Sequence, residues 1–113
     1  MKTFLYSFLA ATLLLTACDE ADIAKSTPSC IRQKAINLER ETVCEEGAYV
    51  KEYSFQGKLV YVFNPGNCIA DASFEVADEQ CNTLGYLGGF SGGYDINGEP
   101  FANAQFKRTI WEQ

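Results

Sequence analysis

Five cysteines lie in a chain of 113 residues that contains no histidine. Without histidine there is no Ser-His or Cys-His couple, no imidazole metal ligand and no imidazole acid–base group. What the cysteines do depends on the redox compartment, because disulfides persist in exported proteins and are rare in the cytosol. The N-terminal sequence therefore decides how the cysteines are interpreted.

The first residues have the pattern of a secretory signal peptide. Lys2 provides a basic start, and the apolar stretch after it is too short for a typical transmembrane helix. Leu15-Thr16-Ala17-Cys18 resembles the lipobox of bacterial lipoproteins, whose cysteine is acylated and becomes the first residue of the mature chain. This resemblance implies a signal peptide at residues 1–17 and a lipid anchor, such as palmitate, on Cys18. Ordinary cleavage after Ala17 is the alternative.

Lipidation also accounts for the odd number of cysteines. With Cys18 acylated, an even set of four remains, which in an exported protein predicts two disulfides: Cys30, Cys44, Cys68 and Cys81. Two or more acyl chains hold a protein stably on a membrane. Asp19-Glu20 after the anchor resembles two sorting signals, one for the inner membrane of enteric bacteria and one for the surface of Bacteroidota-type bacteria. We expect a cell-envelope location, with the outer membrane or cell surface favoured and the inner membrane as the alternative.

The chain carries more acidic than basic residues. Nine basic and fifteen acidic residues give a net charge of −6, which becomes −7 when Lys2 leaves with the signal peptide. This balance lacks the basic footprint of a nucleic-acid-binding protein. Residues 18–28 have no periodic apolar face, and we expect them to be a short flexible tether to a single domain at residues 29–113.

Periodicity predicts one helix followed by strands. The helix runs from Pro28 to about Glu41, with Thr27 as its N-cap. Tyr49–Phe55 and Lys58–Phe63 read as strands of a hairpin, because Gln56-Gly57 between them suits a tight turn.

The second of these strands is apolar at every position from Leu59 to Phe63, so we expect it to be covered on both faces. Further strands are expected at residues 72–76, 82–86 and 104–111, the last contributing Phe106 and Ile110 to the core. The predicted fold is α+β, with one N-terminal helix packed on a small, mainly antiparallel sheet that carries two disulfides.

The same pattern ranks the disulfide pairings. A helix from residue 30 to 41 separates its ends by about 16 Å, whereas residues 41–44 return only about 10 Å, which strains a Cys30–Cys44 bond. Extending the hairpin register places Cys44 beside Cys68. Cys30 then pairs with Cys81 by elimination.

Glycine is concentrated near the C-terminus, where six of the nine glycines lie between Gly85 and Gly98. They permit positive φ and close packing, with Tyr86, Phe90 and Tyr94 filling a loop cluster. The alternative is that these three aromatic residues form an interaction surface. A phosphate cradle is disfavoured, because no Gly-Lys-Ser/Thr follows.

Two metal sites are also disfavoured. Asp95–Glu99 resembles the start of a calcium loop without its full pattern, and a β-turn at Asn97-Gly98 fits better. A zinc site of four thiolates has no Cys-x-x-Cys spacing to support it, and export favours oxidation. We therefore expect no metal and no cofactor.

Several segments together resemble a family of small uncharacterised lipoproteins of Bacteroidota-type bacteria: Val50-Lys51-Glu52-Tyr53, Gly57-Lys58-Leu59-Val60-Tyr61, Asp78-Glu79-Gln80-Cys81-Asn82 and Gly88-Gly89-Phe90-Ser91-Gly92. The resemblance implies a compact, exported, cysteine-bearing domain and brings no known activity. The leading hypothesis is a non-catalytic binding or structural module, with the membrane and an envelope protein as partners. The alternative is a stapled inhibitor of an enzyme such as a protease, acting through residues 86–94, and an enzyme ranks third.

Overall fold

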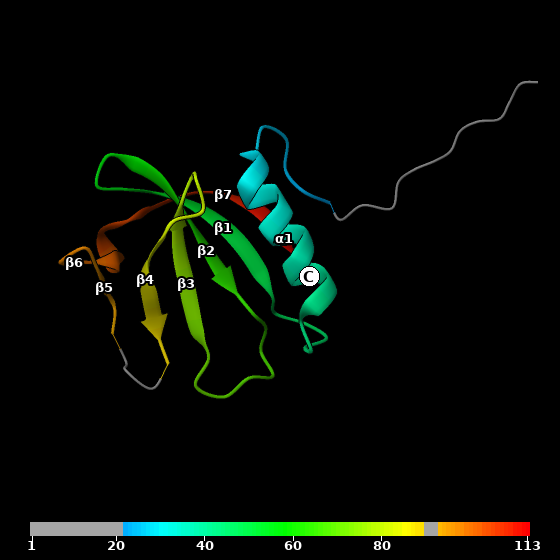
Figure 1. Ribbon diagram of the computed structural model, residues 1–113. Coiled ribbons are helices and arrows are strands. Elements are labelled where there is room, and N and C mark those ends of the chain that lie inside the picture. The colour runs from blue at the N-terminus through cyan, green and yellow to red at the C-terminus, as the bar shows by residue number, and fades with distance from the viewer. Residues whose placement is uncertain (1–21, 90–92) are drawn as a thin grey trace, which may run out of the picture.

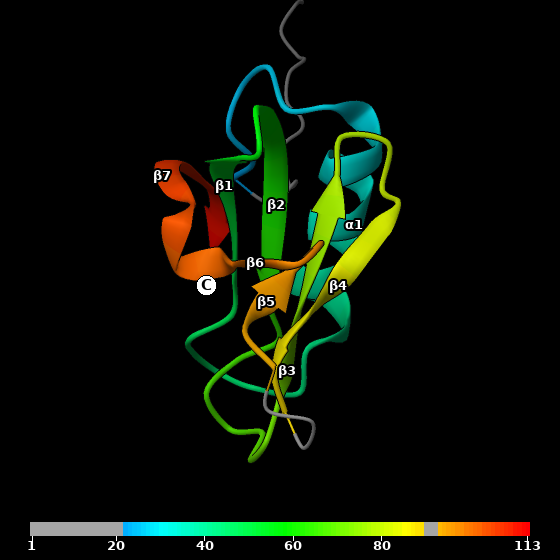
Figure 2. The same ribbon diagram turned by 90° about the vertical axis from the view of Figure 1, so that its left-hand side faces the viewer.

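The computed structural model describes residues 22–89 and 93–113, and in these residues α1 (Ser29–Glu41) packs on one face of a five-stranded antiparallel sheet (Figure 1). The sheet order is β4-β3-β2-β1-β7, with these bounds: β1 Tyr49–Phe55, β2 Lys58–Asn64, β3 Ser73–Asp78, β4 Thr83–Gly88 and β7 Gln105–Glu112. A small hairpin of β5 (Asp95–Ile96) and β6 (Glu99–Pro100) is followed by the 3-10 helix η1 (Phe101–Asn103). Figure 2 shows β5 and β6 in front of the sheet and α1 behind it. The predicted α+β fold is confirmed.

The β1–β2 hairpin has the predicted two-residue turn. Gln56 and Gly57 both have positive φ, at 54° and 77°, as a turn that matches the twist of the strands requires. The register pairs Phe55 with Lys58 and Tyr49 with Asn64, so no residue is skipped along the ladder.

The two faces of the sheet carry different apolar clusters. On the helix face, Val50 and Tyr61 pack against Ile31 of α1. On the opposite face, Val62 and Val76 pack with Ile96 of β5, among other residues. Residues 60–63 of β2 are all buried, which confirms that this strand is covered on both faces.

Strand β7 departs from simple alternation. Its register against β1 shifts twice, between Val50 and Lys51 and between Glu52 and Tyr53. An extra residue in one strand lets consecutive side chains share a face, and both Ile110 and Trp111 are buried in the cluster below α1. Phe106 was expected in the core, but it is 55% exposed.

Both disulfides have the pairing that the sequence geometry favoured. Cys44 bonds to Cys68 and Cys30 bonds to Cys81, with Cα atoms 5.4 and 6.1 Å apart.

The turn that presents Cys81 is organised by Asp78. Its carboxylate accepts hydrogen bonds from the backbone N–H groups of Gln80 and Asn82, each at 2.9 Å. Desolvation opposes the charged form, but these bonds and the Asn82 side chain outweigh it and hold the pKa of Asp78 below its usual value.

The predicted tether at residues 18–28 is wrong for its described part, residues 22–28. Ile23 and Ala24 pack against the core, and the N–H of Ala24 donates to the carbonyl oxygen of Ile110 at 2.9 Å. The physical reason is that β7 is an edge strand with backbone groups left to pair. Thr27 is not the N-cap, because its hydroxyl donates to the Ala24 carbonyl, and α1 begins after Pro28 without a side-chain cap. The predicted signal peptide and Cys18 lie outside the described residues.

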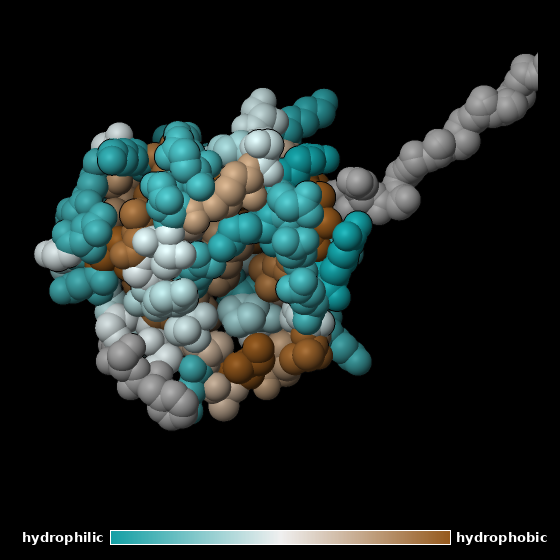
Figure 3. Space-filling model, in the orientation of Figure 1, coloured by the Kyte–Doolittle hydropathy of each residue, from teal (hydrophilic) through white to brown (hydrophobic). Residues whose placement is uncertain are grey.

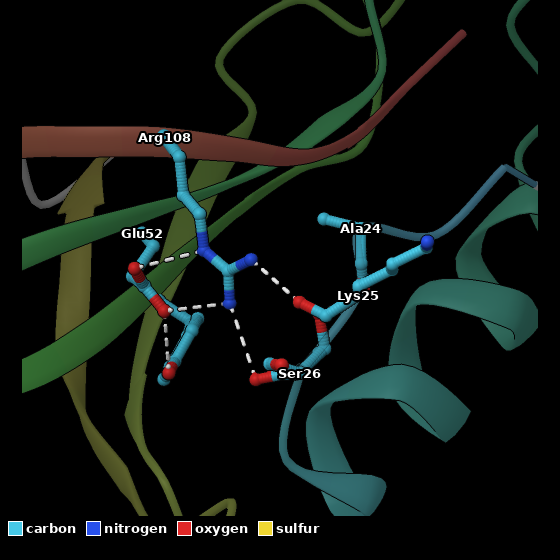
Figure 4. A network of polar contacts seen from close by, with 7 residues as sticks. Ala24, Lys25, Ser26, Glu52 and Arg108 are labelled. Carbon is cyan, nitrogen blue, oxygen red and sulfur yellow. Dashed lines mark hydrogen bonds and ion pairs between the residues drawn. The ribbon is translucent and has the colours of Figure 1, made fainter.

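Arg108 of β7 joins this N-terminal segment to a buried carboxylate (Figure 4). Its guanidinium donates to Glu52 at 3.1 Å through Nε, and to the carbonyl oxygens of Lys25 and Ser26 at 2.6 and 3.3 Å. Glu52 is 5% exposed and also accepts the Tyr61 hydroxyl hydrogen bond at 2.9 Å. Burial, followed by this bond to Glu52, raises the pKa of Tyr61 and keeps its hydroxyl a donor.

We predict that Arg108→Met lowers the free energy of unfolding by about 3 kcal/mol at pH 7, because it leaves the Glu52 carboxylate buried without its counter-ion. Urea denaturation at pH 7 measures this loss. The double variant Arg108→Met/Glu52→Gln should recover part of the stability, and no recovery would contradict the pairing.

Candidate functional site

The face of the sheet opposite α1 carries a wall of aromatic side chains. Along β1, Tyr49 and Tyr53 alternate with Val50 and Glu52, so the two tyrosines point away from α1. Phe74 of β3 meets the Tyr49 ring edge-on at 6.3 Å between centroids. Phe101 of η1 meets the Tyr53 ring edge-on at 5.2 Å. Edge-to-face contacts of this kind hold the rings in defined orientations.

These side chains line a hollow of about 450 Å³, which we call the aromatic groove; its aromatic members are Tyr49, Tyr53, Phe74, Tyr94 and Phe101. Leu87 of β4 and Ala104 complete part of the lining. A volume in the range of 300–1,000 Å³ with a mainly apolar lining is typical of small-molecule sites. The β5–β6 hairpin covers only part of this face, which leaves the groove open.

A second hollow adjoins the first. This loop pocket, of about 590 Å³, lies beneath the β2–β3 connection and shares Phe74, Leu87 and Tyr94 with the aromatic groove. Its other end is polar, with Asn64, Asn67 and Asp71 in its lining. The two hollows therefore form one continuous surface with an aromatic end and a polar end.

Asn64 is the buried polar group of the loop pocket, at 8% exposed. Its pairing with Tyr49 places it on the face opposite α1. Its Oδ1 accepts the backbone N–H of Gly66 at 2.8 Å, but within the described residues its Nδ2 donates to no protein acceptor. A buried donor without a partner is costly, so this amide group is a candidate contact for a ligand or a water molecule.

The aromatic groove is neutral over its described lining, which contains no charged side chain. Burial, and next the neighbouring Tyr49, raises the pKa of Tyr53, so its hydroxyl stays protonated at physiological pH. Lys51, also on β1, places its Nζ 4.1 Å from the centroid of the Tyr49 ring. This contact occupies a cation–π position beside the groove.

The structure divides the predicted interaction surface. Tyr94, 66% exposed, lines both hollows. Tyr86, 54% exposed, lies on the helix face, because it pairs with Glu75, whose carboxylate binds Lys34 of α1 at 2.7 Å. Phe90 lies outside the described residues. The expectation that these three residues share one surface is therefore wrong for Tyr86 and Tyr94.

The other motifs of this region serve backbone geometry. Gly88 and Gly89 both have positive φ, as the packing interpretation expected. Asn97 and Gly98 also have positive φ and form the turn between β5 and β6, so the β-turn prediction is confirmed. The Glu99 carboxylate accepts hydrogen bonds from Gln56 and Asn103.

Sequence reasoning missed Tyr49, Tyr53, Phe74 and Asn64 as site residues. Their strands were predicted, and alternation along β1 groups the two tyrosines together. The alternation does not say which face of the sheet α1 covers. Because α1 covers the other face, these tyrosines lie beside an open hollow.

The surface also has a small apolar tip. Figure 3 shows a group of apolar residues at the lower edge of the view, where Figure 1 shows the α1–β1 and β2–β3 loops. Val43 and Ile69 of these loops are 80% and 40% exposed. The Cys44–Cys68 disulfide joins the two loops beside them.

The loop pocket depends on Gly66, which packs against this disulfide. Gly66 has φ +125°, and an added Cβ would overlap the Cβ and Sγ atoms of Cys44. We predict that Gly66→Ala lowers the free energy of unfolding by about 2–3 kcal/mol and slows formation of the Cys44–Cys68 bond, since strain and overlap add. Gly57→Ala is the matched control, because Gly57 has φ +77° and no atom near its added Cβ. Urea midpoints that fall equally in both variants would contradict this account.

No helix in the described ranges is long and apolar enough to cross a membrane. Comparison with family models matches residues 36–113 to a domain of unknown function (DUF6970). The matched segment includes every strand named above and the C-terminal part of α1. No curated protein and no solved structure matches the chain. Because the match covers more than half of its length, the chain belongs to the family of domains of unknown function DUF6970.

Proposed function

We propose that this protein is a non-catalytic binding module held in the bacterial cell envelope by a lipid on Cys18, and that the aromatic groove is its binding surface. The observation that carries the proposal is the groove itself. Five aromatic rings line a hollow of about 450 Å³ on a face of the sheet that the rest of the domain covers only in part. Exposed aromatic clusters with a few polar groups are favoured recognition surfaces.

The chemistry of the lining favours binding over catalysis. The chain contains no histidine, and the lining of the aromatic groove consists of rings, aliphatic side chains and tyrosine hydroxyls. Such groups provide apolar contact and hydrogen bonds, but near neutral pH they do not supply an acid–base pair. An enzyme that used carboxylates of the loop pocket ranks below a binding module for this reason.

The lipid anchor is supported by the lipobox at Leu15–Cys18. The segment from Ile23 to Ser26 is held against β7 and Arg108, so only the residues between Cys18 and Asp22 separate the proposed anchor from the fold. The four peptide steps from Cys18 to Asp22 span at most about 14 Å. The domain would stay close to the bilayer.

The groove faces away from this attachment. Figure 1 shows residues 22–28 beside α1 on one side of the sheet and the β5–β6 hairpin on the other. A module tethered through the α1 side therefore presents the groove to partners in the envelope or beyond it. Asp19-Glu20 and the family resemblance favour a Bacteroidota-type lipoprotein of the outer membrane or cell surface, with the inner membrane as the alternative.

The alternative function, a stapled inhibitor of a protease, depends on the loop at residues 86–94. Residues 90–92 of this loop lie outside the described part of the chain. Nothing in the geometry of Tyr86 and Tyr94, which lie on different faces, favours a reactive loop over the groove. The inhibitor hypothesis stays a prediction from the sequence.

The anchor is tested by the intact mass of the protein purified from its native membrane. We expect a mature chain that begins at Cys18 and carries two or three acyl chains. We also expect four thiols that alkylating reagents reach only after reduction. A Cys18→Ser variant is the control and should lose the acyl mass. An unacylated native protein would contradict the proposal.

The binding surface is tested by a photo-crosslinking residue placed at position 94 of the full-length protein in intact cells. We expect ultraviolet light to give a discrete adduct from position 94, because this side chain lines both hollows. Position 86 is the matched control, since Tyr86 has similar exposure on the other face. Equal adducts at both positions, or none at position 94, would exclude the groove as the binding surface.

A further inference from the structure

The aromatic groove and the loop pocket differ in chemistry but share three walls. Phe74, Leu87 and Tyr94 line both hollows. A ligand that is longer than a single ring system would therefore contact the aromatic groove and the loop pocket together. One end of this combined site offers aromatic rings. The other end offers the Asn64 amide, the Asn67 side chain and the Asp71 carboxylate. A ligand that fits must therefore be apolar on one side and rich in polar groups on another.

The polar end requires both hydrogen-bond donors and acceptors from its ligand. The Nδ2 group of Asn64, buried and without a protein acceptor among the described residues, requires an acceptor. The Asp71 carboxylate is exposed and only accepts hydrogen bonds, so a ligand in contact with it binds through a donor. Hydroxyl groups satisfy both demands, because each one donates and accepts. Proline-rich peptides, which also dock on aromatic grooves, have few N–H donors to offer Asp71.

The charges of the lining residues narrow the class of ligand further. No lysine or arginine lies in the described lining of either hollow, and Asp71 is an acid, so an anionic ligand finds no counter-ion there. A cationic ligand would meet the Asp71 carboxylate in the loop pocket, but the Lys51 ammonium, which lies over the Tyr49 ring, opposes a second cation at the aromatic groove. A neutral ligand with many hydroxyl groups fits both hollows.

We propose that the combined site binds a neutral glycan. A saccharide ring has an apolar C–H face, which would lie on the aromatic rings of Tyr94 and Phe74, and hydroxyl groups that would meet Asn64 and Asp71. This inference rests on the proposed function, since it names the ligand class of the same groove. It extends that function by excluding charged polymers and by assigning a recognition role to the Asn64 amide.

The test uses the full-length lipidated protein in phosphatidylcholine nanodiscs, which carry no sugar headgroup. The probes are neutral hexasaccharides of glucose, mannose, galactose and xylose, an oligogalacturonate as an acidic glycan and a decaproline peptide. Isothermal titration calorimetry measures each dissociation constant. We expect at least one neutral hexasaccharide to bind with a dissociation constant below 1 mM, and the oligogalacturonate and decaproline to bind at least tenfold more weakly.

Matched variants locate the binding. Tyr94→Ala should weaken the neutral glycan at least tenfold, whereas Tyr86→Ala, an equally exposed tyrosine on the helix face, should change it less than twofold. Asn64→Asp keeps the acceptor for the Gly66 N–H and removes the Nδ2 donor, so it should also weaken binding about tenfold. Thermal unfolding of each variant separates lost binding from lost folding.

The outcomes distinguish this inference from the proposed function. Binding of decaproline or oligogalacturonate without any neutral hexasaccharide would overturn the glycan assignment and leave a binding groove in place. So would the absence of glycan binding together with a crosslinked protein at position 94. The absence of both glycan binding and any crosslink at position 94 would overturn the two proposals together. Glycan binding that Tyr94→Ala leaves unchanged would also overturn the assignment to this site.

Discussion

The central sheet must be covered on both faces, because β2 carries buried apolar side chains on both of its sides. The thirteen-residue helix α1 covers one face. The cover on the other face is much smaller, since β5 and β6 have two residues each and η1 has three. Ile96 of β5 packs into the apolar cluster on this face, and the rest of the face stays open. The aromatic groove is the surface left by this unequal division.

A domain of this size has a limited core, and nonlocal crosslinks add to its stability. The two disulfides tie α1 to the β3–β4 turn, and the α1–β1 loop to the β2–β3 loop. Arg108 adds a polar crosslink, because one guanidinium neutralises buried Glu52 and holds two carbonyl groups of the N-terminal segment. The first described residues of the chain are therefore part of the fold, and they lie beside α1, on the other side of the sheet from the β5–β6 hairpin.

The binding role that we propose depends on the neutral aromatic walls and the polar end of the groove. The rings are held by edge-to-face contacts, so little side-chain freedom is lost when a ligand binds. At the polar end, the Cys44–Cys68 bond holds the loop in place in the same way, because Gly66 packs against it. The disulfide that stabilises the domain thus also shapes the candidate site.

The sequence by itself determined the local elements: the helix, the two-residue hairpin turn, the turn at Asn97-Gly98 and the α+β class. It also favoured the correct disulfide partners, since hairpin register extrapolates over a few residues and elimination leaves one pair. Only the tertiary structure decided that α1 covers the side of Val50, that Ile110 and Trp111 face the same way, and that Tyr86 and Tyr94 are separated by the sheet. Period-two alternation sorts side chains into two sets, but it does not say which set is covered. Bulges and the Arg108 contacts arise from pairings between residues far apart in the chain, which no local pattern records.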